Sequence, residues 1–191
     1  MPPVPHWPTR RTSLLLLAAL PAACGSPSPN LYTLLPVSGP TRSGAPRVIE
    51  LRSVGIARYL ERSQIVRSSE DYRLDILGED WWGEPLDAML TRILVQNLTQ
   101  RLSGSTVYPE NSAVSASPDA TLGINVQRMD LNKDGAVVLT ALISVMRRST
   151  ATRTFTTSVT PTAAGTPGLV AAMSVAVGQL ADRTADLLTG R

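Results

Sequence analysis

The chain has 191 residues and a formal net charge of +3, with 18 lysines and arginines against 15 aspartates and glutamates. Its single histidine, His6, and its single cysteine, Cys24, both lie near the N-terminus, so residues 25–191 contain neither type. This composition excludes histidine-based acid–base catalysis, Ser–His–Asp and Cys–His nucleophiles, and Cys- or His-based zinc sites from most of the chain. The cations, nearly all arginines, are scattered without a dense basic stripe between aromatic residues, which argues against nucleic-acid binding.

An export signal is predicted at the N-terminus. Arg10 and Arg11 precede an apolar run over residues 14–20, which is far shorter than the roughly 20 apolar residues that a membrane span needs. Small residues follow this run, and Cys24 comes directly after Ala23. The segment resembles a bacterial lipoprotein signal peptide, which implies cleavage between Ala23 and Cys24 and covalent attachment of lipid to Cys24. The arginine pair also resembles a twin-arginine signal, so the route of export stays open at this point.

The predicted domain organisation follows from that cleavage site. Residues 1–23 form the signal peptide, residues 24–46 form the lipidated N-terminus and a tether rich in Pro, Ser and Gly, and residues 47–191 form one domain. The signal peptide contains two arginines and no acidic residue, so its removal lowers the net charge from +3 to +1. Gly25 stands where many lipoproteins retained in the inner membrane carry aspartate. By this resemblance the outer membrane is the expected location, with the domain in the periplasm.

Short strands are predicted ahead of one clear helix. Apolar and β-branched residues between turn-forming residues predict strands over residues 31–35, 48–56, 65–68 and 72–77. The helix begins at Pro85, because proline suits the first helical position, and it ends near Gly104. Residues that recur at steps of three and four form one largely apolar face, which consists of Leu86, Met89, Leu90, Ile93, Leu94, Asn97, Leu98 and Leu102.

A second group of strands and a final helix follow. Strand patterns cover residues 106–108, 121–132, 136–146 and 153–160, and Asp134 and Gly135 provide a hairpin turn. The second helix opens at Thr166 and ends at Gly190. The order ββββαββββα predicts an α+β fold. We expect a single domain in which a mostly antiparallel sheet of about eight strands is covered on one face by two helices.

Two motifs carry a family resemblance. The first, residues 58–67, has the sequence Arg-Tyr-Leu-Glu-Arg-Ser-Gln-Ile-Val-Arg, and the second, residues 81–86, has the sequence Trp-Trp-Gly-Glu-Pro-Leu. With the Leu-Tyr-Thr-Leu start at residues 31–34, they resemble the PqiC/YmbA-like ABC-type transport auxiliary lipoprotein family. Its members are the lipoprotein components of MCE-type membrane-integrity transport systems. Trp81 and Pro21 depart from the family pattern, and beyond residue 110 only the layout of strands and helices is similar.

The resemblance implies a non-catalytic outer-membrane lipoprotein that faces the periplasm. Its partners would be an MCE-domain protein anchored in the inner membrane and the associated permease and ATPase, in a system that moves lipid between the membranes. No metal and no cofactor other than the lipid on Cys24 is expected, and the formation of a homo-oligomer stays open. Three other functions also stay open: an assembly or activator lipoprotein such as a pilotin or a cell-wall-synthase activator, an enzyme that uses carboxylates alone, and a lipid carrier with its own cavity.

Candidate partner-binding residues come from the same two motifs. Tyr59, Leu60, Arg62 and Gln64 lie in a loop between strands that mixes an aromatic residue with arginines, and such loops carry recognition. Hydrogen bonds that fix the loop are the alternative role for these residues. Trp82 is the fifth candidate, although a tryptophan just ahead of a helix more often packs against the core. No catalytic residue is predicted.

Overall fold

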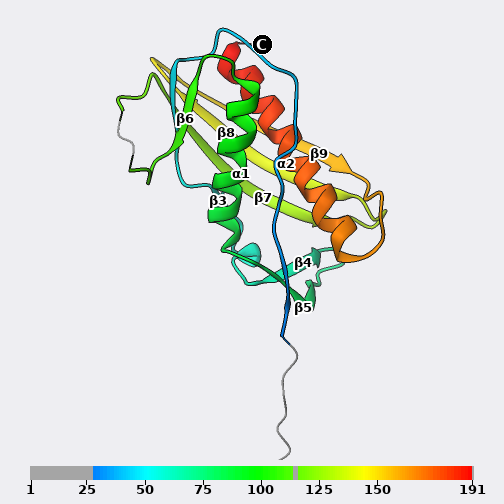
Figure 1. Cartoon of the computed structure of the whole chain (residues 1–191). Helices are drawn as coiled ribbons and strands as arrows, with labels where there is room; N and C mark the ends of the chain where they lie inside the picture. The colour runs from blue at the N-terminus through cyan, green and yellow to red at the C-terminus, as the bar shows by residue number, and fades with distance from the viewer. Residues whose placement is uncertain (1–27, 114–115, 191) are drawn as a thin grey trace, which may run out of the picture.

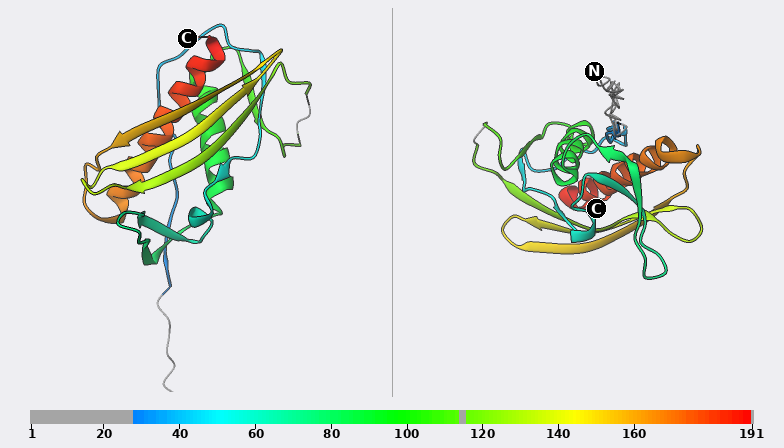
Figure 2. Two further views of the ribbon diagram at one scale, coloured as in Figure 1. Left: turned by 180° about the vertical axis from the view of Figure 1, so that it is seen from behind. Right: turned by 90° about the horizontal axis from the view of Figure 1, so that it is seen from below.

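The computed structural model describes residues 28–113 and 116–190, and all structural statements refer to them. Two helices, α1 (Leu86–Arg101) and α2 (Gly165–Thr189), lie side by side on one face of a nine-stranded sheet (Figures 1 and 2). A short 3-10 helix, η1 (Arg58–Leu60), precedes the fourth strand. The strands are β1 (Asn30–Tyr32), β2 (Val48–Leu51), β3 (Gly55–Ile56), β4 (Gln64–Ser68), β5 (Asp75–Trp82), β6 (Thr106–Pro109), β7 (Ala120–Leu131), β8 (Val137–Met146) and β9 (Thr150–Val159). The α+β class and the placement of both helices on one face are confirmed.

β7 is the central strand, and both of its edges are occupied. Along one edge β2, β3 and β4 pair with it in succession, and all three run parallel to it. Along the other edge β8 pairs antiparallel with β7, and β9 pairs antiparallel with β8. At the periphery, β5 is antiparallel to β4, β1 is parallel to β5, and β6 is parallel to β2.

The sheet is therefore mixed and has nine strands, where the sequence predicts a mostly antiparallel sheet of about eight. The additional strand arises because the predicted strand over residues 48–56 is divided into β2 and β3. Between them the Val54 amide donates to the Thr91 hydroxyl of α1 (3.2 Å) and so turns away from the sheet. Parallel pairing arises because α1 carries the chain back along the sheet, so that β6 runs in the direction of β2.

One hydrophobic core lies between the helices and the sheet. The predicted apolar face of α1 is its buried face. α2 is buried over more of its surface than α1, because it packs against α1 as well as against β8 and β9. Among the described residues, no helix combines the length and the apolar character that a membrane crossing requires.

A strap formed by residues 33–42 crosses the two helices on the side away from the sheet (Figure 1). Leu34 is fully buried, and the amides of Leu35 and Val37 donate to Ser174 of α2 (3.1 Å) and to Asn97 of α1 (2.9 Å). The sequence predicts a tether through residue 46, but these contacts make residues 30–46 part of the folded domain. Composition alone hides this, because one buried leucine and a few backbone hydrogen bonds hold a segment otherwise rich in Pro, Ser and Gly.

Arg101, at the end of α1, fastens the strap to both helices. Its guanidinium is 1% exposed and donates to Asp182 of α2 (2.8 Å), to the Val37 carbonyl of the strap (2.8 Å) and to the Gly178 carbonyl of α2 (3.2 Å). Arg42 of the strap adds an ion pair with Asp186 of α2 (2.6 Å). The two arginines thus join three segments of the chain, and Arg101 supplies a donor to the carbonyls of Val37 and Gly178.

Candidate partner-binding site

The first wall of the candidate site is the loop that contains η1. The Ala57 amide donates to the Val126 carbonyl of β7 (2.9 Å), and the buried side chain of Leu60 anchors the turn in the core. Arg62 Nε then donates to the Tyr59 carbonyl (2.8 Å), which closes the loop on itself. These contacts hold the loop in one position at the edge of the sheet.

A buried carboxylate holds the same loop through the side chain of Tyr59. Asp130 of β7 is fully buried, and it accepts hydrogen bonds from the hydroxyls of Tyr59 and Ser69 (both 2.7 Å) and from Arg128 Nε (2.9 Å). Burial raises the pKa of the Tyr59 phenol above its ordinary value, and the hydrogen bond to Asp130 raises it further. The phenol therefore stays protonated and donates to Asp130, so Tyr59 acts as a positioning residue for the loop.

The second wall consists of the end of β5 and the start of α1. The Trp82 amide donates to the Ser63 carbonyl (2.7 Å) and so joins this wall to the loop, while the Trp82 side chain is 6% exposed. Glu84 forms an ion pair with Arg92 in the second turn of α1. Asp87 lies in the first turn of α1, where the helix dipole favours a carboxylate.

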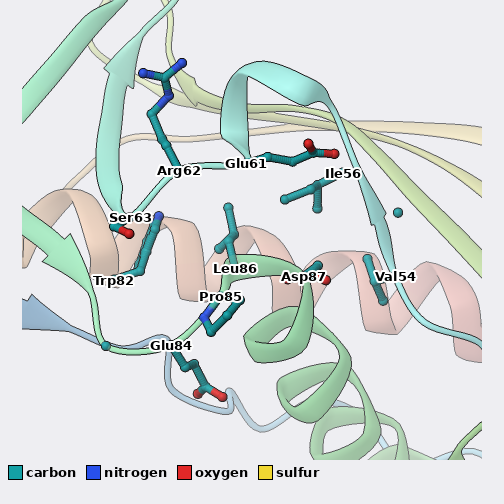
Figure 3. Close-up of a pocket in the computed structure, with 12 residues that line it drawn as sticks. Val54, Ile56, Glu61, Arg62, Ser63, Trp82, Glu84, Pro85, Leu86 and Asp87 are labelled. Carbon is teal, nitrogen blue, oxygen red and sulfur yellow. The ribbon is translucent and has the colours of Figure 1, made fainter. Parts of the chain in front are cut away.

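These two walls and β3 enclose a pocket of about 610 Å³ (Figure 3). Its apolar lining comes from Val54, Ile56, Trp82, Pro85 and Leu86, and its charged lining comes from Glu61, Arg62, Glu84 and Asp87. The volume lies within the range of pockets that bind small ligands. The combination of apolar surface with charged side chains around it suits recognition of another molecule. In the part of the chain that the structure describes, no three His, Cys, Asp or Glu side chains are grouped so as to hold a metal ion.

The sequence of residues 32–185 matches the family described as ABC-type transport auxiliary lipoprotein component. The chain belongs to this family. It is 31% identical over 132 residues to the intermembrane transport lipoprotein PqiC of Escherichia coli strain K12, and the alignment covers 66% of this chain and 69% of PqiC. By this family membership the chain is an auxiliary lipoprotein component of ABC-type transport.

Two crystal structures share the fold of this auxiliary lipoprotein. One is an uncharacterised protein with a TM-score of 0.72 and 22% identity, over 85% of this chain and 99% of that protein. The other is a DUF330 protein from Xanthomonas campestris with a TM-score of 0.68 and 18% identity, over 84% and 93% of the two chains. At these identities the likeness establishes the fold alone.

The structure brings two of the five predicted partner-binding residues into the pocket and places the other three around it. Arg62 and Trp82 line the pocket. Tyr59 and Leu60 fix the loop from behind, and Gln64 begins β4, opposite Trp81 of β5. Partner contact by any of the five stays a prediction. The cleavage site and lipidation site, Ala23 and Cys24, lie outside the described residues.

The sequence reasoning missed several pocket residues. Glu61 and Ser63 lie inside the first motif, and Asp87 lies one residue beyond the second. Their position in or beside the motifs could have predicted that they line the same site. Nothing in the sequence links Val54 and Ile56 to this site, because they lie outside both motifs. They reach the pocket because β3 separates from β2 and lies alongside the start of α1.

Proposed function

We propose that this auxiliary lipoprotein is anchored in the outer membrane, faces the periplasm and acts as a non-catalytic docking subunit of an MCE-type lipid transport system. In this proposal its partner is the MCE-domain protein anchored in the inner membrane, which works with a permease and an ATPase. The only prosthetic group is the lipid on Cys24. The residue types of the pocket support the absence of catalysis, because it contains no histidine or cysteine to act as nucleophile or general base.

The observation that carries the proposal is the pocket itself. The two motifs that typify the family are separated in the sequence by residues 68–80, which include most of β5, yet the fold assembles them as facing walls of one pocket. The Trp82–Ser63 hydrogen bond joins them directly. Motif residues that met only in the core would indicate packing, whereas residues that surround an open pocket indicate recognition.

Co-purification from cells tests the proposal. We expect the full-length lipoprotein to capture the MCE-domain protein encoded in the same operon. Ser63 is exposed on the pocket wall, and its side chain makes no hydrogen bond within the described chain, so Ser63→Arg obstructs the pocket without removing an internal contact. We expect this variant to capture less of the MCE protein.

The matched control is Ser149→Arg. Ser149 is also exposed, lies in the turn between β8 and β9 at the opposite end of the domain, and receives the same added charge (Figure 1). Its capture of the MCE protein should equal that of the wild type. Capture of a secretin or of a cell-wall synthase in place of the MCE protein would contradict the proposal.

A further inference from the structure

The edge of β3 that faces the pocket has no neighbouring strand. Within the described residues β3 pairs with β7 alone. The Ala57 amide points to β7, where it meets the Val126 carbonyl, and the Val54 amide points the other way, to Thr91 of α1. Backbone groups of successive residues point to alternate sides of a strand. The N–H and C=O of Ile56 therefore point away from β7 and toward the pocket, on the same side as the Val54 amide. An open strand edge of this kind can pair with an added strand.

Two carboxylates line the pocket beside that edge. Glu61 comes from the η1 loop and Asp87 from the first turn of α1, and both are exposed and line the pocket. In the described part of the chain neither side chain makes an ion pair or a hydrogen bond. Figure 3 shows both on the same side of the pocket as Val54 and Ile56, whereas Arg62 extends from the opposite side of the loop. The charge beside the open edge is therefore negative.

An apolar surface separates the two carboxylates. Ile56 and Leu86 lie between them in Figure 3, and Trp82 continues this surface beneath Ser63. A bound metal ion would gain nothing from that surface, and a phosphate group would be repelled by the two carboxylates. An extended peptide fits all three features, because its backbone pairs with the strand edge, its apolar side chains cover Ile56 and Leu86, and its cationic side chain meets the acids.

We propose that the pocket binds an extended peptide segment of the partner protein, which adds as a strand to the open edge of β3 and places a lysine or arginine between Glu61 and Asp87. This inference rests on the proposed docking function and specifies the chemistry of the segment that docks. The backbone pairing supplies affinity without sequence preference, and the two carboxylates select for a basic residue among apolar ones.

A synthetic peptide tests this proposal on the full-length, lipidated protein in detergent micelles. The probe is fluorescein-labelled Gly-Val-Arg-Val-Arg-Val-Gly, and its control carries glutamate in place of arginine. Fluorescence anisotropy at low ionic strength should show binding of the arginine peptide and binding at least about tenfold weaker for the glutamate peptide. Equal binding of the two peptides, or binding of neither, would overturn the proposal.

Charge-reversal variants locate the contact. The double variant Glu61→Lys, Asp87→Lys should weaken binding of the arginine peptide about tenfold, since each exposed ion pair contributes a few-fold. The double variant Glu79→Lys, Glu110→Lys is the matched control with the same change in net charge, because both acids are exposed, lie outside the pocket and form no ion pair in the described part of the chain. An equal loss of binding in the control would show that the peptide responds only to net charge, and the proposal would then fail.

Amide hydrogen exchange tests the strand pairing without any substitution. Saturation with the arginine peptide should slow exchange of the Ile56 amide at least about tenfold, because that amide gains an acceptor. The Ala57 amide already donates to Val126 and serves as the internal reference, so its exchange should stay unchanged. An unchanged Ile56 amide would refute strand addition. That result would not affect capture of the MCE protein in cells. The proposed docking function and this inference can therefore be refuted independently of each other.

Discussion

Asp130 and Tyr59 lie on separate segments of the chain, and their side chains meet at 2.7 Å behind the pocket loop. Tyr59→Phe removes one donor from a fully buried carboxylate, which keeps Ser69 and Arg128 as partners. We therefore expect the free energy of unfolding at pH 7 to fall by about 1 kcal/mol, as measured by urea denaturation. The control is Tyr72→Phe, because Tyr72 is fully exposed and its hydroxyl makes no hydrogen bond among the described residues.

The same hydrogen bond predicts how stability depends on alkaline pH. The folded-state pKa of Tyr59 is raised above the unfolded value of about 10, first by burial and then by Asp130. The protonated phenol therefore stabilises the fold fully below pH 10, and this contribution is lost as the pH rises from 10 toward the folded-state pKa. Between pH 10 and pH 11.5 the wild type should lose stability more steeply than Tyr59→Phe. Equal slopes for the two proteins would contradict the assigned role.

The sequence predicted a residue's role in the site only where that residue belongs to a short motif of neighbouring residues. Arg62 and Trp82 belong to compact motifs, and both line the pocket. Asp130 gave no signal, because it lies in a strand whose alternation is otherwise regular and its partner Tyr59 is distant in the sequence. Leu60 could not be distinguished from an exposed contact residue, since its burial depends on the turn of η1.

At the scale of secondary-structure elements, Arg101 joins α1, α2 and the strap. Arg101→Ala leaves the partly buried carbonyl of Val37 and the buried carbonyl of Gly178 without this donor and weakens the pairing of Asp182. We expect a loss of about 3–5 kcal/mol in the free energy of unfolding, because the hydrogen bonds of one buried charge to Asp182, Val37 and Gly178 are lost together. Faster exchange of the Val37 amide should accompany it, because the strap then detaches more readily.

The matched control for this substitution lies on the same helix. Arg92→Ala removes an ion pair with Glu84, in which the arginine side chain is 42% exposed, and one exposed hydrogen bond to Thr33 at the start of the strap (3.2 Å), so it should cost less than about 1 kcal/mol. A similar loss for the two variants would show that Arg101 does not fasten the strap in the way described. Urea denaturation of both variants under one condition makes the comparison.

Elements with a long, regular hydrophobic pattern were predictable from the sequence, but the strands that they pair with were not. The face of α1 and the β7–β8–β9 meander follow directly from periodicity and from the Asp134–Gly135 turn. The parallel pairing of β2, β3 and β4 with β7 depends on how α1 returns the chain, which periodicity does not encode. The strap was missed because its attachment depends on Arg101 and Asn97, which lie some 60 residues further along the chain.

At the scale of the whole molecule, the pocket lies near the N-terminal end of the described chain, which leads to the proposed lipid anchor. The Gly83 amide of the pocket donates to the Tyr32 carbonyl of β1 (2.8 Å), so β1 borders the pocket. The six residues from Gly25 to Asn30 reach at most about 20 Å. A lipid on Cys24 would therefore hold the pocket close to the membrane surface, and the partner segment would have to extend to that surface to bind.

Cys24→Ser tests this arrangement. Two or more acyl chains hold a protein stably on a membrane, so the variant should move from the membrane fraction to the soluble fraction. Its thermal unfolding midpoint and its affinity for the arginine peptide should equal those of the wild type, because the pocket is built from residues 54–87. Capture of the MCE protein in cells should fall, since the anchor no longer concentrates the pocket at the membrane. A Cys24→Ser protein that stays in the membrane fraction after removal of the signal peptide would show that another part of the chain supplies the membrane attachment.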